Sequence, residues 1–349
     1  MSSNAPIARP ILVIFPGALG DLICAVPALR AIARRHPDSP CELMARAELA
    51  RFATGRLGLA AASSYATDGL SEGHARGHSI DRREVAHLFA ARGDPDAISS
   101  EARAFFGAFA HVYSFFASDD AHFRSALASA TDGRASFIPF RPPGEGHVAA
   151  AYLRELGALG ALETGANPSV SRTLSKTPED DESLLDCSIE LYREDIDLAE
   201  DRLTSLGLDI GKYLLVLPGS GSIAKNWPSE NFIALAIRLA SRIPSLVVIG
   251  PAEAALEPIF AASGLPMLAH LELAEVAALA RLSAAFVGND SGVSHLAAAT
   301  GAHGLALFGS TDLARWRPLG RATVIRHEPL DALLPDEVAA AISEIIGAK

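Results

Sequence analysis

The sequence predicts an α/β fold of two doubly wound, parallel-sheet domains of the Rossmann-like type. Its 349 residues exceed one ordinary domain and suit two. Short apolar runs such as 11–15, 213–217 and 284–288 have the length of buried strands. Segments with helical spacing follow these runs, and this alternation is typical of parallel sheets with right-handed crossovers.

The first half opens as a strand–helix–strand unit. A buried strand over 11–15 leads through a glycine-bearing turn into a helix over 22–36, and residues 41–45 form the next strand. Pro27 is tolerated because it falls in or near the first turn of that helix. Residues 55–110 show no clear periodicity. Beyond them we expect a strand at 111–116, a helix reaching 130, a short strand at 137–140 and a helix at 148–159.

The second half alternates more clearly. A polar segment over 165–186 is typical of a linker, so we predict a first domain of residues 1–170 and a second of residues 171–349. The sequence leaves open whether the closing helix, residues 335–346, packs back on the first domain. Strands are expected at 213–217, 246–250, 267–271, 284–288, 304–309 and 322–326, and helices at 197–206, 231–243, 252–262, 273–280 and 296–300.

Composition and charge limit the classes of function. The chain is 49% hydrophobic and 20% charged, as a globular protein with a large core would be. Residues 1–175 hold 17 Lys+Arg and 17 Asp+Glu, so the net charge of −11 comes from the second half. An acidic chain argues against a nucleic-acid partner. With three cysteines, no apolar run long enough for a membrane span and no secretory signal at residues 1–10, we expect a cytoplasmic protein.

One turn in the second half is a candidate ligand site. Asn289-Asp290-Ser291-Gly292 lies between a buried strand and a helix of small residues that Gly301 terminates. Ligands of open α/β sheets bind at such strand ends, and the N–H groups of a helix start attract anions. His295 lies one helical turn after Ser291. The alternative is a simple cap before a core helix.

Three more turns follow strands of the same predicted sheet. Residues 218–222 offer backbone N–H groups and the hydroxyls of a Ser220-Gly221-Ser222 turn, with Lys225 nearby as a point charge for phosphate. Glu253 follows another strand, where it could accept hydrogen bonds from ribose. Residues 309–312 form the last turn. Each has a simpler interpretation as a loop or a helix start, but together they favour a phosphate- and sugar-binding edge.

The corresponding turn of the first half contains Gly17, Gly20 and Asp21. Asp21 begins a helix, and the helix dipole favours the ionised carboxylate that a general base needs. A plain N-cap is the alternative. The turn is neither a complete dinucleotide fingerprint nor a P-loop, and the sequence has no zinc motif and no nucleophile elbow.

These features resemble glycosyltransferase family 9, the lipopolysaccharide heptosyltransferases. The resemblance covers about residues 11–45 and 212–320. Phe15-Pro16 departs from the family, where many members have a basic or polar residue. The motifs occur in family order: Gly20-Asp21 with Pro27-Ala-Leu-Arg30, Pro218-Gly-Ser, Lys225-Asn-Trp-Pro228, Gly250-Pro-Ala-Glu253, Asn289-Asp-Ser-Gly-Val-Ser-His-Leu296 and Leu307-Phe-Gly-Ser-Thr-Asp312.

The resemblance implies a GT-B fold, in which two Rossmann-like domains face a central cleft. It assigns the acceptor to residues 1–170 and the nucleotide-sugar donor to residues 171–349. Asp21 would be the general base, beside an acceptor-side turn with Gly17 and Gly20. The implied donor-binding residues are Ser220, Gly221, Ser222, Lys225, Glu253, Asn289, Asp290, Ser291, Gly292 and His295, and the family uses neither a cofactor nor a catalytic metal.

The resemblance therefore implies an inverting glycosyltransferase that moves a heptose or related sugar from an ADP-sugar to a lipopolysaccharide-core-type acceptor. Such an acceptor is lipid-linked, so we expect transient contact with the inner membrane. We expect no nucleic-acid partner. Two alternatives remain open: a non-catalytic nucleotide-sugar-binding protein of the same fold, and a GT-B-like epimerase that needs no acceptor.

Overall fold

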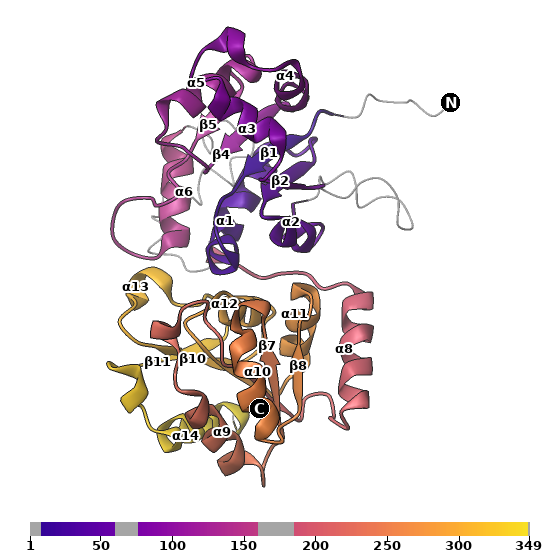
Figure 1. The fold of residues 1–349 in the computed structure, drawn as a ribbon, viewed down its shortest axis with the longest axis vertical. Coiled ribbons are helices and arrows are strands. Elements are labelled where there is room, and N and C mark those ends of the chain that lie inside the picture. The colour runs from indigo at the N-terminus through magenta and orange to yellow at the C-terminus, as the bar shows by residue number, and fades with distance from the viewer. Residues whose placement is uncertain (1–7, 60–75, 160–184, 348–349) are drawn as a thin grey trace. The chain divides into compact units, whose positions relative to one another are not determined.

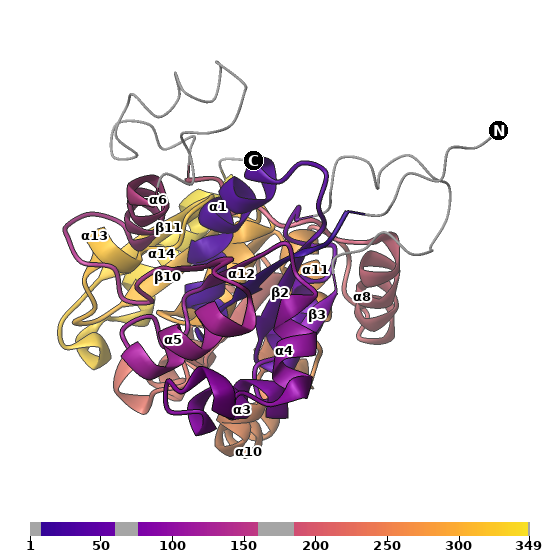
Figure 2. The same ribbon diagram turned by 90° about the horizontal axis from the view of Figure 1, so that it is seen from above.

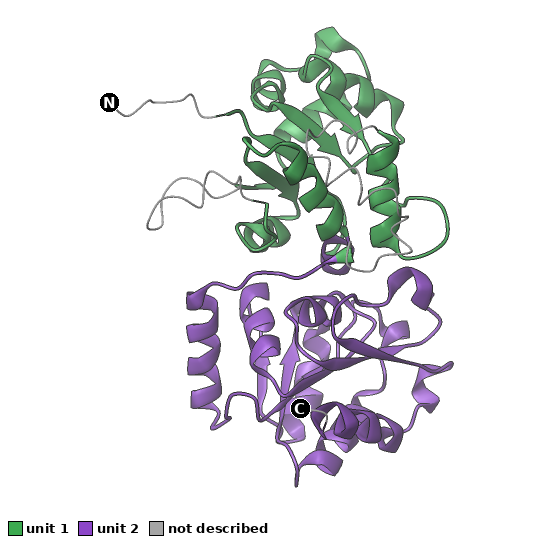
Figure 3. Cartoon of the chain, turned by 180° about the vertical axis from the view of Figure 1, so that it is seen from behind, with its two compact units in different colours: residues 1–18, 25–185 green, residues 19–24, 186–349 purple. Residues whose placement is uncertain are grey.

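The computed structural model describes residues 8–59, 76–159 and 185–347. The chain forms two compact units, drawn in green and purple in Figure 3. Unit 1 comprises Met1–Ala18 and Ala25–Leu185, and unit 2 comprises Leu19–Cys24 and Asp186–Lys349. Most of the predicted linker, residues 165–184, lies outside the described residues. The boundary after Leu185 falls close to its end.

Unit 1 contains a five-stranded parallel sheet in the order β3-β2-β1-β4-β5, of which Figure 1 labels β1, β2, β4 and β5. The central strand β1 is wholly buried, which suits an apolar run with helices on both faces. Its neighbours β2 and β4 are in register with it, with Ile11 opposite both Cys41 and His111. The strands are β1 (Ile11–Ile14), β2 (Cys41–Ala45), β3 (Gly77–Ser79), β4 (His111–Ser114) and β5 (Ala135–Phe137).

The helices of unit 1 pack on this sheet through apolar side chains. Figure 2 shows α3, α4 and α5 grouped together, and their inner faces share one core with Leu12, Ile14 and Val112 of the sheet. The helices are α1 (Leu19–Arg35), α2 (Ala47–Ala53), α3 (Arg83–Ala90), α4 (Ser100–Gly107), α5 (Ala121–Ala130) and α6 (Val148–Ala158), with a 3₁₀ turn at Pro95–Ala97.

Unit 2 contains a six-stranded sheet in the order β11-β10-β9-β6-β7-β8, and its paired strands all run parallel. The first strand of the unit, β6, lies at the centre beside β9, as in the Rossmann order. The strands are β6 (Leu214–Leu217), β7 (Ser245–Ile249), β8 (Met267–Ala269), β9 (Ala285–Asn289), β10 (Gly304–Phe308) and β11 (Ala322–Arg326).

The helices of unit 2 include the one that closes the chain. In the structure α9 and α14 lie side by side (Figure 1), and Val338 and Ile342 of α14 are buried in the core of unit 2. The closing helix thus packs within unit 2. The helices are α8 (Arg193–Ser205), α9 (Ser229–Leu239), α10 (Glu257–Ala262), α11 (Leu273–Leu282), α12 (Gly292–Ala299), α13 (Leu313–Trp316) and α14 (Pro335–Gly347), with 3₁₀ turns at Ile223–Lys225, Pro251–Leu256 and Leu330–Ala332.

The prediction of two parallel-sheet α/β domains is confirmed. Two local predictions were incomplete. Helix α1 begins at Leu19, three residues earlier than expected, so Pro27 lies inside the helix and removes one N–H from its hydrogen-bond ladder. The stretch without clear periodicity contains α3, a 3₁₀ turn and α4, which are too short for a strong periodic signal.

The three cysteines are core residues, as their number and spacing suggested. Cys24, Cys41 and Cys187 are all buried, and none of them forms a disulfide. Burial raises the pKa of the Cys41 thiol to about 12, with a further contribution from the charge of Glu42. In the described part of the chain, no helix combines the length and the apolar character needed to cross a membrane.

A half-buried histidine cluster lies at the amino-terminal edge of the sheet in unit 1. His111 is hydrogen-bonded to Ser136 Oγ at 2.9 Å, and its ring stacks on His36, which is 3.0 Å from the Tyr113 hydroxyl. Burial lowers the pKa of His111 to about 4, assisted by the charges of His36 and the nearby Arg35 and Arg134. Burial also lowers the pKa of His36, assisted by the charge of Arg35, so both imidazoles favour the neutral form.

We predict that this cluster makes the protein less stable in mild acid. The pKa of His111 is lower in the folded state, so its contribution is complete above about pH 6.5 and is lost as the pH falls toward 4. The His111→Gln variant should lose less thermal stability than the parent between pH 7 and pH 5. The exposed His122→Gln variant is the control. An equally steep acid loss in His111→Gln would contradict the prediction.

Candidate active site

The candidate site lies where the strand order of unit 2 reverses. Strands β6 and β9 are neighbours in the sheet, yet their connections leave in opposite directions along it. In doubly wound sheets the crevice at the carboxyl ends of two such strands is where ligands bind. Here those ends carry the loop 218–227 after β6 and the turn 289–292 after β9. The turns after β7 and β10 share the same edge because all these strands are parallel.

Asn289 joins the turn after β9 to the loop after β6. The side chain is fully buried, and its Oδ1 accepts a hydrogen bond from the Trp227 N–H at 2.9 Å. Its Nδ2 donates to the Pro218 carbonyl oxygen at 2.7 Å. The amide therefore holds both ends of the loop, and this satisfies polar groups that would be costly to bury alone. Its contribution to a bound ligand would come through the position of the loop.

The loop after β6 is held further by its own side chains. The Ser220 hydroxyl is 2.7 Å from the Ser222 carbonyl oxygen and is hydrogen-bonded to the Asn226 side chain. It also accepts a hydrogen bond from the Ser222 N–H at 3.3 Å. Gly221 has a φ of +68°, in the left-handed region that favours glycine. Ser220 thus shapes the loop, while Gly221 and Ser222 are exposed.

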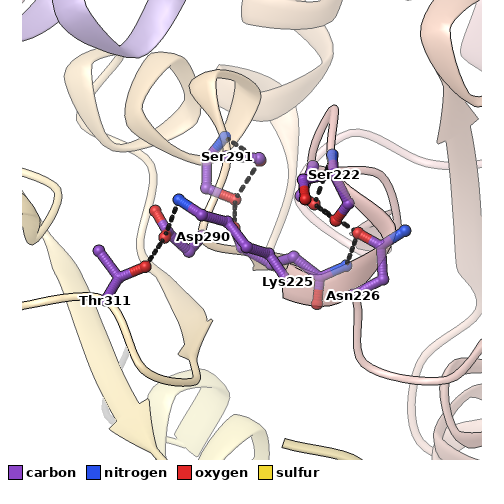
Figure 4. A network of polar contacts seen from close by, with 9 residues as sticks. Ser222, Lys225, Asn226, Asp290, Ser291 and Thr311 are labelled. Atoms are coloured by element: carbon purple, nitrogen blue, oxygen red, sulfur yellow. Dashed lines mark hydrogen bonds and ion pairs between the residues drawn. The ribbon is translucent and has the colours of Figure 1, made fainter.

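Lys225, Asp290 and Thr311 meet at this edge, as Figure 4 shows. The Lys225 ammonium donates to Asp290 Oδ2 at 2.8 Å, and the Thr311 hydroxyl donates to the same oxygen at 2.6 Å. The Asp290 side chain is 8% exposed and that of Lys225 is 44% exposed. The carboxylate is therefore buried behind a positive charge that stays accessible to solvent.

Helix α12 begins beside this ion pair. Ser291 is its N-cap and accepts a hydrogen bond from the Ser294 N–H at 3.3 Å, while the Ser294 hydroxyl donates to the Asn289 carbonyl oxygen at 2.7 Å. Gly301 follows the helix with a φ of +81°, as predicted for its termination. His295 is 5% exposed, and its Nδ1 lies 3.6 Å from Cys24 Sγ. These contacts fix the first turn of the helix.

Glu253 lies against the loop after β6. Its Oε1 accepts a hydrogen bond from the Gly221 N–H at 3.0 Å. A Cβ on Gly219 would lie 2.4 Å from Glu253 Cδ, and a Cβ on Gly250 would lie 2.7 Å from Glu253 Oε2. Both glycines therefore leave the space that the carboxylate occupies. In this arrangement Glu253 joins the turn after β7 to the loop after β6.

The start of α1 is grouped with unit 2, although Gly17 belongs to unit 1. Gly20 and Gly292 allow a close approach, since a Cβ on Gly292 would lie 2.9 Å from the Gly20 nitrogen. Asp21 lies in the first turn of α1 and is half-buried. Burial raises the pKa of the Cys24 thiol, and the charges of Cys187, Asp21 and Asp290 raise it further. Both carboxylates therefore lie within electrostatic range of Cys24.

The sequence interpretation missed Thr311 and Asn226 as individual members of the site. Thr311 belongs to the recognised turn after β10, and β10 is the neighbour of β9 in the sheet. Its contact with Asp290 could have been inferred only from that strand order. Among the described residues, no group of three or more His, Cys, Asp or Glu side chains converges as a metal site would.

Comparisons with known proteins give one family match and several structural matches. Residues 174–332 match the family model described as glycosyltransferase family 9 (heptosyltransferase). No curated protein sequence matches the chain. The family match includes the turns after β6, β7, β9 and β10.

Several solved structures share the fold over nearly the whole chain. The ADP-heptose lps heptosyltransferase II of E. coli is 18% identical with a TM-score of 0.66, covering 97% of this chain and 99% of that one. The family 9 glycosyl transferase of Veillonella parvula is 18% identical with a TM-score of 0.67, and coverage is 100% of both chains. The E. coli heptosyltransferase WaaC with ADP is 19% identical with a TM-score of 0.59, covering 96% of this chain and 99% of that one.

These structures establish a GT-B fold of two parallel-sheet α/β domains. The family match covers most of unit 2 and contains the buried Asp290, the accessible Lys225 and the glycine-bounded Glu253. Residues 174–332, a little under half of the chain, are therefore similar to glycosyltransferase family 9 (heptosyltransferase), and the whole chain shares the fold of solved heptosyltransferases.

Proposed function

We propose that the chain is an inverting, metal-independent glycosyltransferase that moves a heptose or related sugar from an ADP-sugar to a lipopolysaccharide-core-type acceptor. The main support is the accessible ammonium of Lys225, held 2.8 Å from the buried carboxylate of Asp290 beside the start of α12. A departing nucleoside diphosphate needs fixed positive charge and N–H donors, and this edge offers both. ADP-heptose is the donor in the name of one similar enzyme, and another was solved with ADP.

In the proposed reaction an acceptor hydroxyl attacks the anomeric carbon of the donor sugar. The new bond forms between that oxygen and the carbon as the bond to the β-phosphate oxygen breaks. The hydroxyl proton goes to the Asp21 carboxylate, and the electron pair leaves with the diphosphate. One displacement at the anomeric carbon inverts its configuration. Lys225 and the first N–H groups of α12 compensate the charge of the leaving group.

The remaining residues would position the donor. Glu253, which accepts from Gly221, has a second oxygen for ribose hydroxyls, and Gly221 and Ser222 expose their backbone to the phosphates. Asn289 and Ser220 would act by holding the loop, and Asp290, Ser291, Gly292 and His295 would shape the sugar and phosphate site. Gly17 and Gly20 would form the acceptor-side turn.

The acceptor and the location belong to the same proposal. A lipopolysaccharide core is lipid-linked, so the enzyme would act in the cytoplasm and touch the inner membrane transiently. The net charge of −11 opposes broad adhesion to anionic lipid, and residues 1–175 are electrically balanced. Contact should therefore involve the first domain.

The first prediction concerns Asp21. The Asp21→Asn variant should lower the kcat of sugar transfer by about 10²–10⁴-fold, because the amide cannot take the acceptor proton. Its dissociation constant for ADP should stay close to that of the parent. The control is Asp38→Asn, an exposed aspartate beyond the end of α1. Transfer at the parental rate in Asp21→Asn would show that another group is the base.

The second prediction concerns Lys225. The Lys225→Met variant should bind ADP about ten- to a hundredfold more weakly, because a charge-assisted hydrogen bond to phosphate is lost. Isothermal titration calorimetry with ADP measures this change, and thermal unfolding shows whether the variant stays folded. Lys212→Met is the control, since the Lys212 side chain is 75% exposed and pairs with Asp209. Unchanged ADP affinity would contradict the phosphate role.

One assay separates the proposed function from its two alternatives. Purified parent protein is incubated with ADP-heptose, with and without a lipopolysaccharide-core acceptor, and the products are identified by mass spectrometry and NMR. Sugar transfer with an inverted anomeric centre supports the proposal. Binding without any turnover would indicate a nucleotide-sugar-binding protein, and conversion of the free donor without acceptor would indicate an epimerase.

A further inference from the structure

Thr311 contacts the candidate site without belonging to its predicted ligand-binding residues. It lies in the turn after β10, and its hydroxyl donates to Asp290 Oδ2 at 2.6 Å. The same oxygen accepts from the Lys225 ammonium at 2.8 Å (Figure 4). One buried carboxylate oxygen therefore receives both a neutral and a charged donor, which come from the loops that follow two different strands, β10 and β6.

We propose that Thr311 is a positioning residue that fixes the Asp290 carboxylate and, through it, the Lys225 ammonium. This inference rests on the proposed function, because it concerns the charge that faces the leaving diphosphate. Thr311 would contact neither the donor nor the acceptor. It would act through Asp290 alone.

The surrounding structure holds the Thr311 hydroxyl in place. Asp312, the next residue, is the N-cap of α13 and accepts from the Ala314 N–H at 3.0 Å. On the other side, Arg326 at the end of β11 donates to the Gly309 carbonyl oxygen at 3.3 Å. Threonine is also restricted about its first side-chain torsion, so little conformational entropy opposes this contact. The turn therefore presents the hydroxyl at a defined position.

The two hydrogen bonds to Asp290 Oδ2 have different roles. An ammonium has three N–H donors, and the Lys225 side chain keeps 44% of its surface exposed while it gives one donor to Asp290. The other N–H groups of the ammonium can donate to an anion that approaches from the solvent. Thr311 supplies the second hydrogen bond to the buried carboxylate, so Asp290 does not depend on Lys225 alone. Without that hydroxyl, the ammonium would be drawn toward the carboxylate and away from the phosphate.

The test compares two variants that each keep half of the threonine side chain. Thr311→Val keeps the β-branched shape and removes the hydroxyl, whereas Thr311→Ser keeps the hydroxyl and removes the methyl group. We expect Thr311→Val to lower the kcat of sugar transfer roughly tenfold, since a hydrogen bond to a charged group is lost. The KM for the ADP-sugar should change much less. Thr311→Ser should retain a kcat close to that of the parent.

The matched control is Thr323→Val, the same substitution at an exposed position of β11. It should leave kcat and KM unchanged. Parental kcat in Thr311→Val would overturn the proposal. So would an equal loss in Thr311→Ser, because the methyl group rather than the hydroxyl would then be what matters.

A second measurement does not depend on enzymatic activity. Thermal stability is compared for Thr311→Val, Lys225→Met and the double variant. Either donor alone still satisfies Asp290 Oδ2, but the double variant leaves a buried carboxylate oxygen without both donors. Its loss of melting temperature should therefore exceed the sum of the two single losses.

The two measurements separate the inference from the proposed function. The double variant could lose more melting temperature than the two single variants together while the parent protein transfers no sugar. That result would support the coupling of Thr311 to Lys225 through Asp290 and would reject the transferase mechanism. An additive loss would overturn the coupling through Asp290, whatever the activity of the parent.

Discussion

The arrangement of the candidate site depends on the buried amide of Asn289. It joins the end of β9 to both ends of the loop after β6, with hydrogen bonds to the Trp227 N–H and the Pro218 carbonyl oxygen. Lys225 lies inside that loop and Asp290 directly follows Asn289, so the amide also sets the distance between the two charges. The amide also donates to the Asn226 side chain at 3.5 Å. Because three groups of the loop after β6 are hydrogen-bonded to one buried amide, the loop has few other conformations open to it.

The pairing of Lys225 with Asp290 balances two opposing requirements. A buried carboxylate needs a partner, and an anion-binding site needs a positive charge that reaches solvent. The structure meets both because the carboxylate side chain is 8% exposed while the lysine side chain is 44% exposed. An incoming anion would therefore meet an ammonium that is already oriented, which lowers the cost of ordering a long side chain on binding.

Much of the fold could be predicted from the sequence, because buried parallel strands are nearly continuous apolar runs. The strands β1, β6 and β9 are examples. The stretch around α3 and α4 could not be assigned, since short helices between polar segments give weak periodicity. The start of α1 was misplaced because glycine and alanine at residues 17–20 favour a turn as much as a helix.

The candidate site was predictable as a set of turns but not as a set of contacts. Residue types after strand ends indicate phosphate or sugar binding, yet they do not reveal that Asn289 and Ser220 use their side chains to hold the loop. Nor do they reveal that Thr311 reaches Asp290, because that contact depends on β10 lying next to β9. Such contacts follow from strand order, which local sequence does not encode.

The burial of all three cysteines has a practical consequence for spectroscopy. Cys24, Cys41 and Cys187 have at most 3% of their surface exposed, and burial raises the pKa of the Cys24 and Cys41 thiols. An exposed thiolate attacks the double bond of a maleimide dye, so the native chain, whose thiols are buried, should label poorly. One cysteine introduced on the surface of each unit would then carry a fluorophore pair without removal of the natural thiols. Energy transfer between the dyes would report the distance between the two labelled positions, with and without a bound nucleotide.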